Sequence, residues 1–124
     1  MNMNKKDIAA SFLQLVASGK IREAYDKYVH PNFRHHNTYF KGDRESLMIA
    51  MEGAQKKNPN KVLDIKMALE DGDRVAVLSH VKQNLQDRGS AVVHIFRFDG
   101  NHVVEMWDLG QQIPENMPNE NGMF

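Results

Sequence analysis

The sequence predicts an α+β fold, with helices first and a mainly antiparallel sheet after them. Apolar residues recur at helical spacing over roughly the first 57 residues. From Val62 onward they alternate with polar residues at a period of two, as in half-buried strands. Short turn signals join the alternating segments, which is typical of antiparallel neighbours.

Three one-sided apolar stripes predict three amino-terminal helices that cover the sheet. The stripes are Ile8, Phe12, Leu15 and Val16; then Ile21, Ala24, Tyr25, Tyr28 and Val29; then Leu47, Met51 and Ala54. We expect Gly19 to end the first helix and Pro31 the second, because proline cannot continue a helix. Asp43 is the expected N-cap of the third, which should end before Asn58-Pro59.

Four strands are expected, joined by short turns into a meander. They run over 62–69, 74–83, 91–98 and 102–108. Asp71-Gly72-Asp73 and Asp99-Gly100-Asn101 are the expected tight turns, and residues 87–90 mark the loop between the other two strands. Residues 1–124 are predicted to form a single domain, and the proline- and asparagine-containing tail 111–124 is expected to be irregular.

Charge and composition exclude several partner classes. The 16 basic and 16 acidic residues cancel, so the chain has no general attraction to phosphate backbones and nucleic-acid binding is not expected. No apolar run approaches the roughly 20 residues that span a bilayer, so we expect no membrane partner. The sequence has no cysteine, which excludes disulfides and thiolate sites and fits a cytoplasmic location.

The last predicted hairpin brings a histidine and an aspartate to one face of the sheet. A three-residue turn at 99–101 would set Phe98 opposite His102 and His94 opposite Met106. A two-residue turn would shift the register by one and break this sharing of a face. The inward set would be Val92, His94, Phe96, Phe98, Val104, Met106 and Asp108, and the outward set Ile95, Arg97, Val103, Glu105 and Trp107.

An apolar face that carries a few polar groups is typical of a ligand pocket. The candidate polar groups on the inward face are His94 and Asp108. Alternation on the preceding strand sets Ala76, Leu78 and His80 on one face, so His80 is a further candidate for the same cavity.

Several motifs resemble those of a SnoaL-like domain of the nuclear-transport-factor-two-like superfamily, over nearly the whole chain. They are Tyr28-Val29, His36-Asn37, 72–75, 95–100 and 103–108. The segments 112–115 and 121–124 resemble a bacterial subgroup described as predicted aldol-condensation-catalysing enzymes. Thr38 departs from that subgroup, which usually has proline after the His-Asn pair.

The resemblance implies a cone-shaped, curved sheet wrapped around the helices (the cystatin-like fold), with a pocket between them. It implies that Asp108 is the general acid/base and His94 its partner on the preceding strand. It also implies that His36 and Asn37 line the pocket mouth. Such a pair can move a proton next to a carbonyl without a metal or another cofactor. Tyr39, Phe96 and Met106 are expected to contact substrate, and Asn37 or Tyr39 to hold an enolate oxygen.

Two other function classes stay open. The first is a small-molecule-binding or interaction domain of the same fold without turnover. The second is a metal enzyme, which would need His36, His80 and His94 to converge by folding; adjacent His35 and His36 point to opposite sides of an extended chain. No metal site is expected. The apolar outer sheet face, with Trp107, Ile95 and Val103, predicts a homodimer interface, and cover by the carboxy-terminal tail is the alternative.

Overall fold

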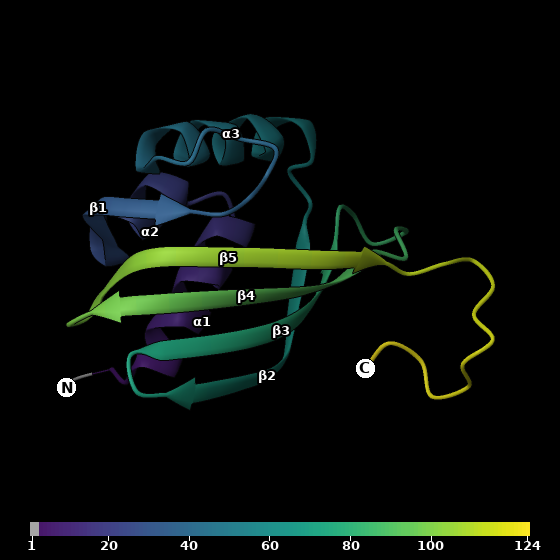
Figure 1. The fold of residues 1–124 in the computed structure, drawn as a ribbon. Coiled ribbons are helices and arrows are strands. Elements are labelled where there is room, and N and C mark those ends of the chain that lie inside the picture. The colour runs from purple at the N-terminus through teal and green to yellow at the C-terminus, as the bar shows by residue number, and fades with distance from the viewer. Residues whose placement is uncertain (1–2) are drawn as a thin grey trace.

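A five-stranded sheet forms the body of the protein, and three helices pack on one of its faces (Figure 1). The structure is a computed structural model and describes residues 3–124. The elements are α1 (Lys5–Ala17), α2 (Ile21–Tyr28), β1 (Val29–His35), α3 (Arg44–Lys57), β2 (Val62–Asp71), β3 (Arg74–Lys82), β4 (Ser90–Asp99) and β5 (His102–Gln112). Strand order is β1-β5-β4-β3-β2, so the predicted α+β class with a mainly antiparallel sheet is confirmed.

Local sequence signals set the helix ends. The Asn4 side chain caps α1 by accepting from the Asp7 amide at 2.8 Å, and Gly19 follows α1 with a φ of 87°. The predicted N-cap of α3 is confirmed, because the Asp43 carboxylate accepts from the Ser46 amide at 3.1 Å. These bonds satisfy amide groups that have no partner within the helix.

The first strand was not expected from the sequence, so the predicted four-stranded meander is wrong by one strand. Pro31 lies within β1, which is an edge strand parallel to β5. Proline is tolerated at a sheet edge because its missing amide interrupts only a ladder that solvent faces. The register of β1 also shifts between Val29 and Arg34, which removes the regular alternation that would have revealed a strand.

The hairpin between β4 and β5 has a different register from the predicted one, but it still places His94 and Asp108 on the same face of the sheet. Asp99 pairs with His102, so the turn has two residues, and the register shifts again between Arg97 and Phe98. His94 therefore lies opposite Asp108 and not opposite Met106. One short turn and one bulge each move the register by one residue, so their effects on side-chain parity cancel.

The same bulge reverses one local assignment. Val103, predicted on the outer face, is 1% exposed and belongs to the core, opposite Phe98. The core lies between the sheet and the helices. It consists of Ile8, Ala9, Phe12, Leu13, Ile21, Ala24, Tyr25, Val29, Phe33, Leu47, Met48, Val75, Val77, Phe96, Phe98, Val103 and Met106.

The carboxy-terminal tail leaves the sheet and turns back toward it (Figure 1). β5 continues to Gln112, so the irregular segment begins two residues later than predicted. At its end the Phe124 ring lies 5.0 Å from the His80 ring and 5.3 Å from the Lys66 ammonium. None of the helices among residues 3–124 is long and apolar enough to cross a membrane.

Candidate functional site

His94 and Asp108 are direct partners across β4 and β5. Both lie on the face that the helices cover. Val77, which pairs with His94 on β3, and Phe96, two residues along β4, are fully buried there. The His94 ring stacks on Phe96, with ring centroids 6.0 Å apart and an interplanar angle of 16°. The stacking fixes the plane of the imidazole.

His94 forms part of the wall of an apolar hollow between the helices and the sheet, which we call the inner cavity. Its volume is about 160 Å³. Its lining residues are Phe12, Leu13, Val16, Ala17, Met51, Lys61, Val62, Leu63, Val81 and His94. The volume is below the range of pockets for drug-sized ligands, so the cavity suits a small molecule.

Asp108 borders a second hollow of about 240 Å³, the loop pocket, formed by the loop after β1 and the end of β5. Asn37 connects the two sides of this pocket. Its amide nitrogen donates to Asp108 Oδ2 at 3.1 Å, while its amide oxygen accepts from the Tyr39 backbone at 2.9 Å. The second bond sets which end of the amide faces the carboxylate.

The His94–Asp108 pair has unused hydrogen-bonding capacity. His94 Nδ1 and Asp108 Oδ1 are both buried, and neither has a partner among residues 3–124. Leaving a buried polar atom unpaired costs about 1–3 kcal/mol, so such atoms are usually satisfied or functional. Two of them on paired residues beside cavities indicate groups placed to meet a ligand.

Burial lowers the pKa of His94, and the Asp108 carboxylate opposes this effect. The imidazole is therefore neutral at neutral pH. A neutral imidazole carries one donor and one acceptor nitrogen. Next to a carboxylate, this arrangement can accept a proton from carbon and donate a hydrogen bond to oxygen in the same site.

Solved structures share this architecture. An NTF2-like protein of unknown function from Cytophaga hutchinsonii is similar at a TM-score of 0.73 and 13% identity, covering 90% of this chain and 93% of its own. A SnoaL-like protein from Agrobacterium tumefaciens, proposed to be an isomerase, is similar at a TM-score of 0.73 and 10% identity. The match covers 88% of this chain and 99% of that protein's chain. A proposed polyketide cyclase from Acidithiobacillus ferrooxidans has a TM-score of 0.69 at 22% identity, covering 89% and 91%.

The chain has the NTF2-like fold. No family model and no curated protein matches the sequence. The likeness to NTF2-like proteins therefore rests on the arrangement of elements and shows the fold.

Within this NTF2-like fold, two predicted site histidines have imidazoles outside the inner cavity. His36 borders the loop pocket, but its Nε2 lies 2.6 Å from Glu105 Oε2 and its ring stacks on Trp107, with ring centroids 5.0 Å apart. The prediction for His80 is wrong in placement. Val75, Val77 and Ser79 are the inward residues of β3, so His80 faces outward, where its Nε2 bonds the Arg88 carbonyl at 2.7 Å.

The other predicted contacts divide into core and surface. Phe96 and Met106 are 0% and 1% exposed and line neither hollow. They are therefore core residues that pack beneath the site, and the prediction that they contact substrate is wrong for this structure. Tyr39 borders the loop pocket and is 87% exposed. No group of three or more histidine, cysteine, aspartate or glutamate side chains suited to a metal occurs within residues 3–124.

Two residues near the candidate site were not identified from the sequence. Lys61 contributes to the inner cavity wall, and a lysine directly before a strand gives no pattern that separates it from a surface residue. Glu105 is 5% exposed and is held by Arg34, Arg97 and His36 on the outer face. Hydrogen bonds with His36, Arg34 and Arg97 lower the pKa of Glu105 to about 2, with the His36 bond the largest cause, and burial opposes this shift.

Proposed function

We propose that this protein is a SnoaL-like enzyme that performs general acid/base chemistry on a small, apolar carbonyl compound. The observation that carries the proposal is the buried His94–Asp108 pair, with one unpartnered polar atom on each residue beside the cavities. Similarity to proteins proposed to be polyketide cyclases and isomerases supports the same reaction class. The chemistry needs only these side chains and no bound metal.

In the proposed step, Asp108 Oδ1 takes the proton from the carbon next to the substrate carbonyl. The C–H electron pair forms the enolate double bond, and the carbonyl oxygen becomes an oxyanion. His94, with its proton on Nδ1, donates a hydrogen bond to that oxygen. The Asn37 amide holds the carboxylate through Oδ2 and leaves Oδ1 free to react. The enolate then takes a proton at another carbon or attacks a second carbonyl, as in isomerase or aldol chemistry.

Proton–deuterium exchange tests this step without knowledge of the natural substrate. Small ketones and aldehydes, 4-methyl-2-pentanone among them, are incubated with the protein in D₂O, and loss of the α-proton signal is followed by NMR. We expect exchange above the buffer rate, and a loss of about a hundredfold or more in Asp108→Asn, the usual scale for a positioned acid/base. Asp99→Asn is the matched control, since Asp99 is an exposed residue of the same hairpin.

The alternative is a binding domain of this fold without turnover. The orphaned polar atoms would then serve only to hold a ligand. Exchange equal to buffer for every probe, together with probe binding that survives in Asp108→Asn, would favour the binding domain and reject the enzyme.

We further propose that the outer sheet face forms a homodimer interface. Two apolar rows cross four strands there, as the pairing register shows: Leu69, Ala76, Ile95 and Trp107, and Met67, Leu78, Val93 and Leu109. Leu69 and Leu109 are 64% and 72% exposed, while the tail reaches only the His80 end of the face. Stable interfaces bury about 800 Å² per partner, and such exposed apolar rows are rare on monomers.

The dimer is tested by sedimentation over a range of protein concentrations. Leu69→Lys should shift the protein to a monomer, because it sets a charge in the apolar row, while Lys82→Ala at the far end of β3 should not. A wild-type protein that stays monomeric at high concentration would exclude this interface. The cytoplasmic location stays a prediction from composition.

A further inference from the structure

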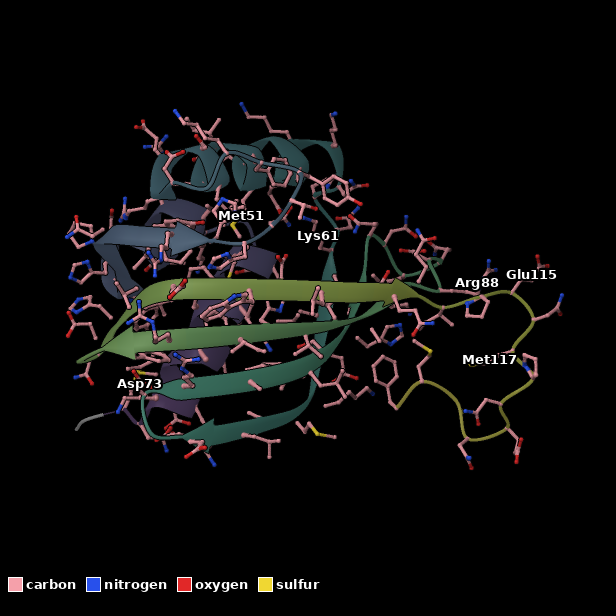
Figure 2. The ribbon with its side chains drawn as sticks, viewed as in Figure 1. Met51, Lys61, Asp73, Arg88, Glu115 and Met117 are labelled. Carbon is pink, nitrogen blue, oxygen red and sulfur yellow. The ribbon has the colours of Figure 1, made fainter. Side chains whose placement is uncertain are left out.

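Lys61 stands where the inner cavity opens toward the surface. It contributes to the wall of the inner cavity together with Met51, and both labelled residues lie between α3 and the sheet in Figure 2. It also borders a surface hollow of about 350 Å³ with Asn60, Val62, Asn84, Leu85 and Gln86. A residue shared by an inner and an outer hollow lies at the rim between them.

The ammonium of Lys61 has no anionic partner in the part of the chain that the structure describes. No carboxylate lies within 4.0 Å of it among residues 3–124, whereas Lys27 and Lys66 each pair with a neighbouring acid. Lys61 is half-buried, and burial lowers its pKa. Withdrawing a charged amine from water without a partner is unfavourable, and a ligand anion at the rim would offset that cost.

The remaining wall indicates the rest of the ligand. Apart from His94 and Lys61, every residue that lines the inner cavity is apolar. The inner cavity therefore offers a ligand two polar residues, His94 in its wall and Lys61 at its rim. A ligand that satisfies both carries an apolar body, a carbonyl and an anionic end.

We propose that the ligand class of this site is a small apolar oxo acid, whose carboxylate pairs with Lys61 while its carbonyl faces His94. The carbonyl end of this inference rests on the proposed function, and the carboxylate end rests on Lys61 alone. Lys61 thereby sets substrate specificity and takes no part in the proton transfer.

A matched pair of probes isolates the carboxylate. In 4-methyl-2-oxopentanoate a carboxylate replaces one methyl group of 4-methyl-2-pentanone, and the branched body is shared. Dissociation constants are measured by NMR titration of the whole protein. We expect the oxo acid to bind at least about tenfold more tightly than the ketone, since tenfold is the effect of one modest ion pair.

Three variants test the assignment. Lys61→Met should abolish the preference for the oxo acid, so that the oxo acid and the ketone bind with similar dissociation constants, while Lys61→Arg should retain the preference because the charge remains. Lys57→Met is the matched control, since Lys57 is exposed at the end of α3 and lines no part of the cavity. Amide spectra and melting temperatures verify that each variant is folded.

The outcomes separate this inference from the proposed function. Equal binding of both probes by the wild type, no binding of the oxo acid, or an unchanged preference in Lys61→Met overturns the oxo-acid inference, whatever Asp108 does. A Lys61-dependent preference combined with deuterium exchange that ignores Asp108→Asn supports the inference about the anionic end and rejects the acid/base function.

Discussion

Replacement of Glu105 by glutamine tests the charge cluster on the outer sheet face. Arg97 donates to Glu105 Oε1 at 2.9 Å, Arg34 donates to Oε2 at 3.0 Å, and His36 Nε2 lies 2.6 Å from Oε2. Glutamine keeps the shape of the side chain and removes its charge. The cluster fixes the loop after β1 onto β5, so its loss should appear as a lower free energy of unfolding.

The magnitude follows from the pKa of Glu105, which the cluster lowers from 4.5 to about 2. That difference corresponds to about 3 kcal/mol between the charged and neutral forms. It is an upper limit, because the Glu105 side chain is 6% exposed but the Arg34 side chain is 66% exposed and water screens its charge. We therefore expect Glu105→Gln to lose about 1–2 kcal/mol at neutral pH.

The lowered pKa of Glu105 also predicts how its contribution to the free energy of unfolding changes with pH. Folding lowers the pKa of Glu105, so its contribution is complete above the unfolded-state pKa of 4.5 and is lost as the pH falls from there toward about 2. The wild type and Glu105→Gln should therefore differ at neutral pH and converge across this acid window. Urea unfolding at one fixed protein concentration measures the difference, since a dimer would make stability depend on concentration.

Glu115→Gln provides the matched control, because it makes the same chemical change in the exposed tail. It should leave the free energy of unfolding within about 0.5 kcal/mol of the wild type. Equal stabilities of wild type and Glu105→Gln at neutral pH, or a gap that persists unchanged through the acid window, would refute the reasoning.

Three further predictions concern the site and the core. Asn37→Ala should slow deuterium exchange by about tenfold, since it removes the hydrogen bond to Asp108 Oδ2, and NMR exchange rates with 4-methyl-2-pentanone check it. His80→Ala should leave those rates unchanged, because His80 faces outward; a slowed rate would contradict the placement. Phe96→Ala should cost about 3–5 kcal/mol in urea unfolding, since the ring is fully buried between Phe12 and His94; a loss under about 1 kcal/mol would show a loosely packed core.

Helices and strands with a regular apolar periodicity could be predicted from the sequence, whereas the short strand β1, whose apolar pattern is interrupted, could not. Alternation from Val62 identified the four antiparallel strands, and the N-cap at Asp43 located α3. β1 was missed because Pro31 reads as a helix end, and because its pairing with β5 joins segments about 70 residues apart. A parallel edge strand leaves no turn signal beside it.

The prediction of which face of the sheet a side chain occupies was unreliable where the strand register could not be read from the sequence. His80 was assigned inward by counting from a strand whose pairing with β4 was unknown, and one step of parity reverses the assignment. His94 and Asp108 were assigned to the same face on a wrong turn length, and the bulge beside Arg97 restored the parity. Lys61 was missed because its importance comes from the cavity that α1, α3 and β2 form together.

The adjacent pair His36-Asn37 explains why both faces of β5 become ordered around the site. Neighbouring residues of an extended segment project to opposite sides, so His36 reaches outward to Glu105 and Trp107 while Asn37 reaches inward to Asp108. The backbone between them is tied to β5, since the His36 amide donates to the Met106 carbonyl at 3.0 Å. The loop therefore contacts both faces of β5 and is hydrogen-bonded to its backbone. Glu105→Gln weakens the contacts on the outer face and should therefore also disturb the Asn37–Asp108 hydrogen bond on the inner face. The rate of deuterium exchange that depends on Asp108 should then fall together with the free energy of unfolding.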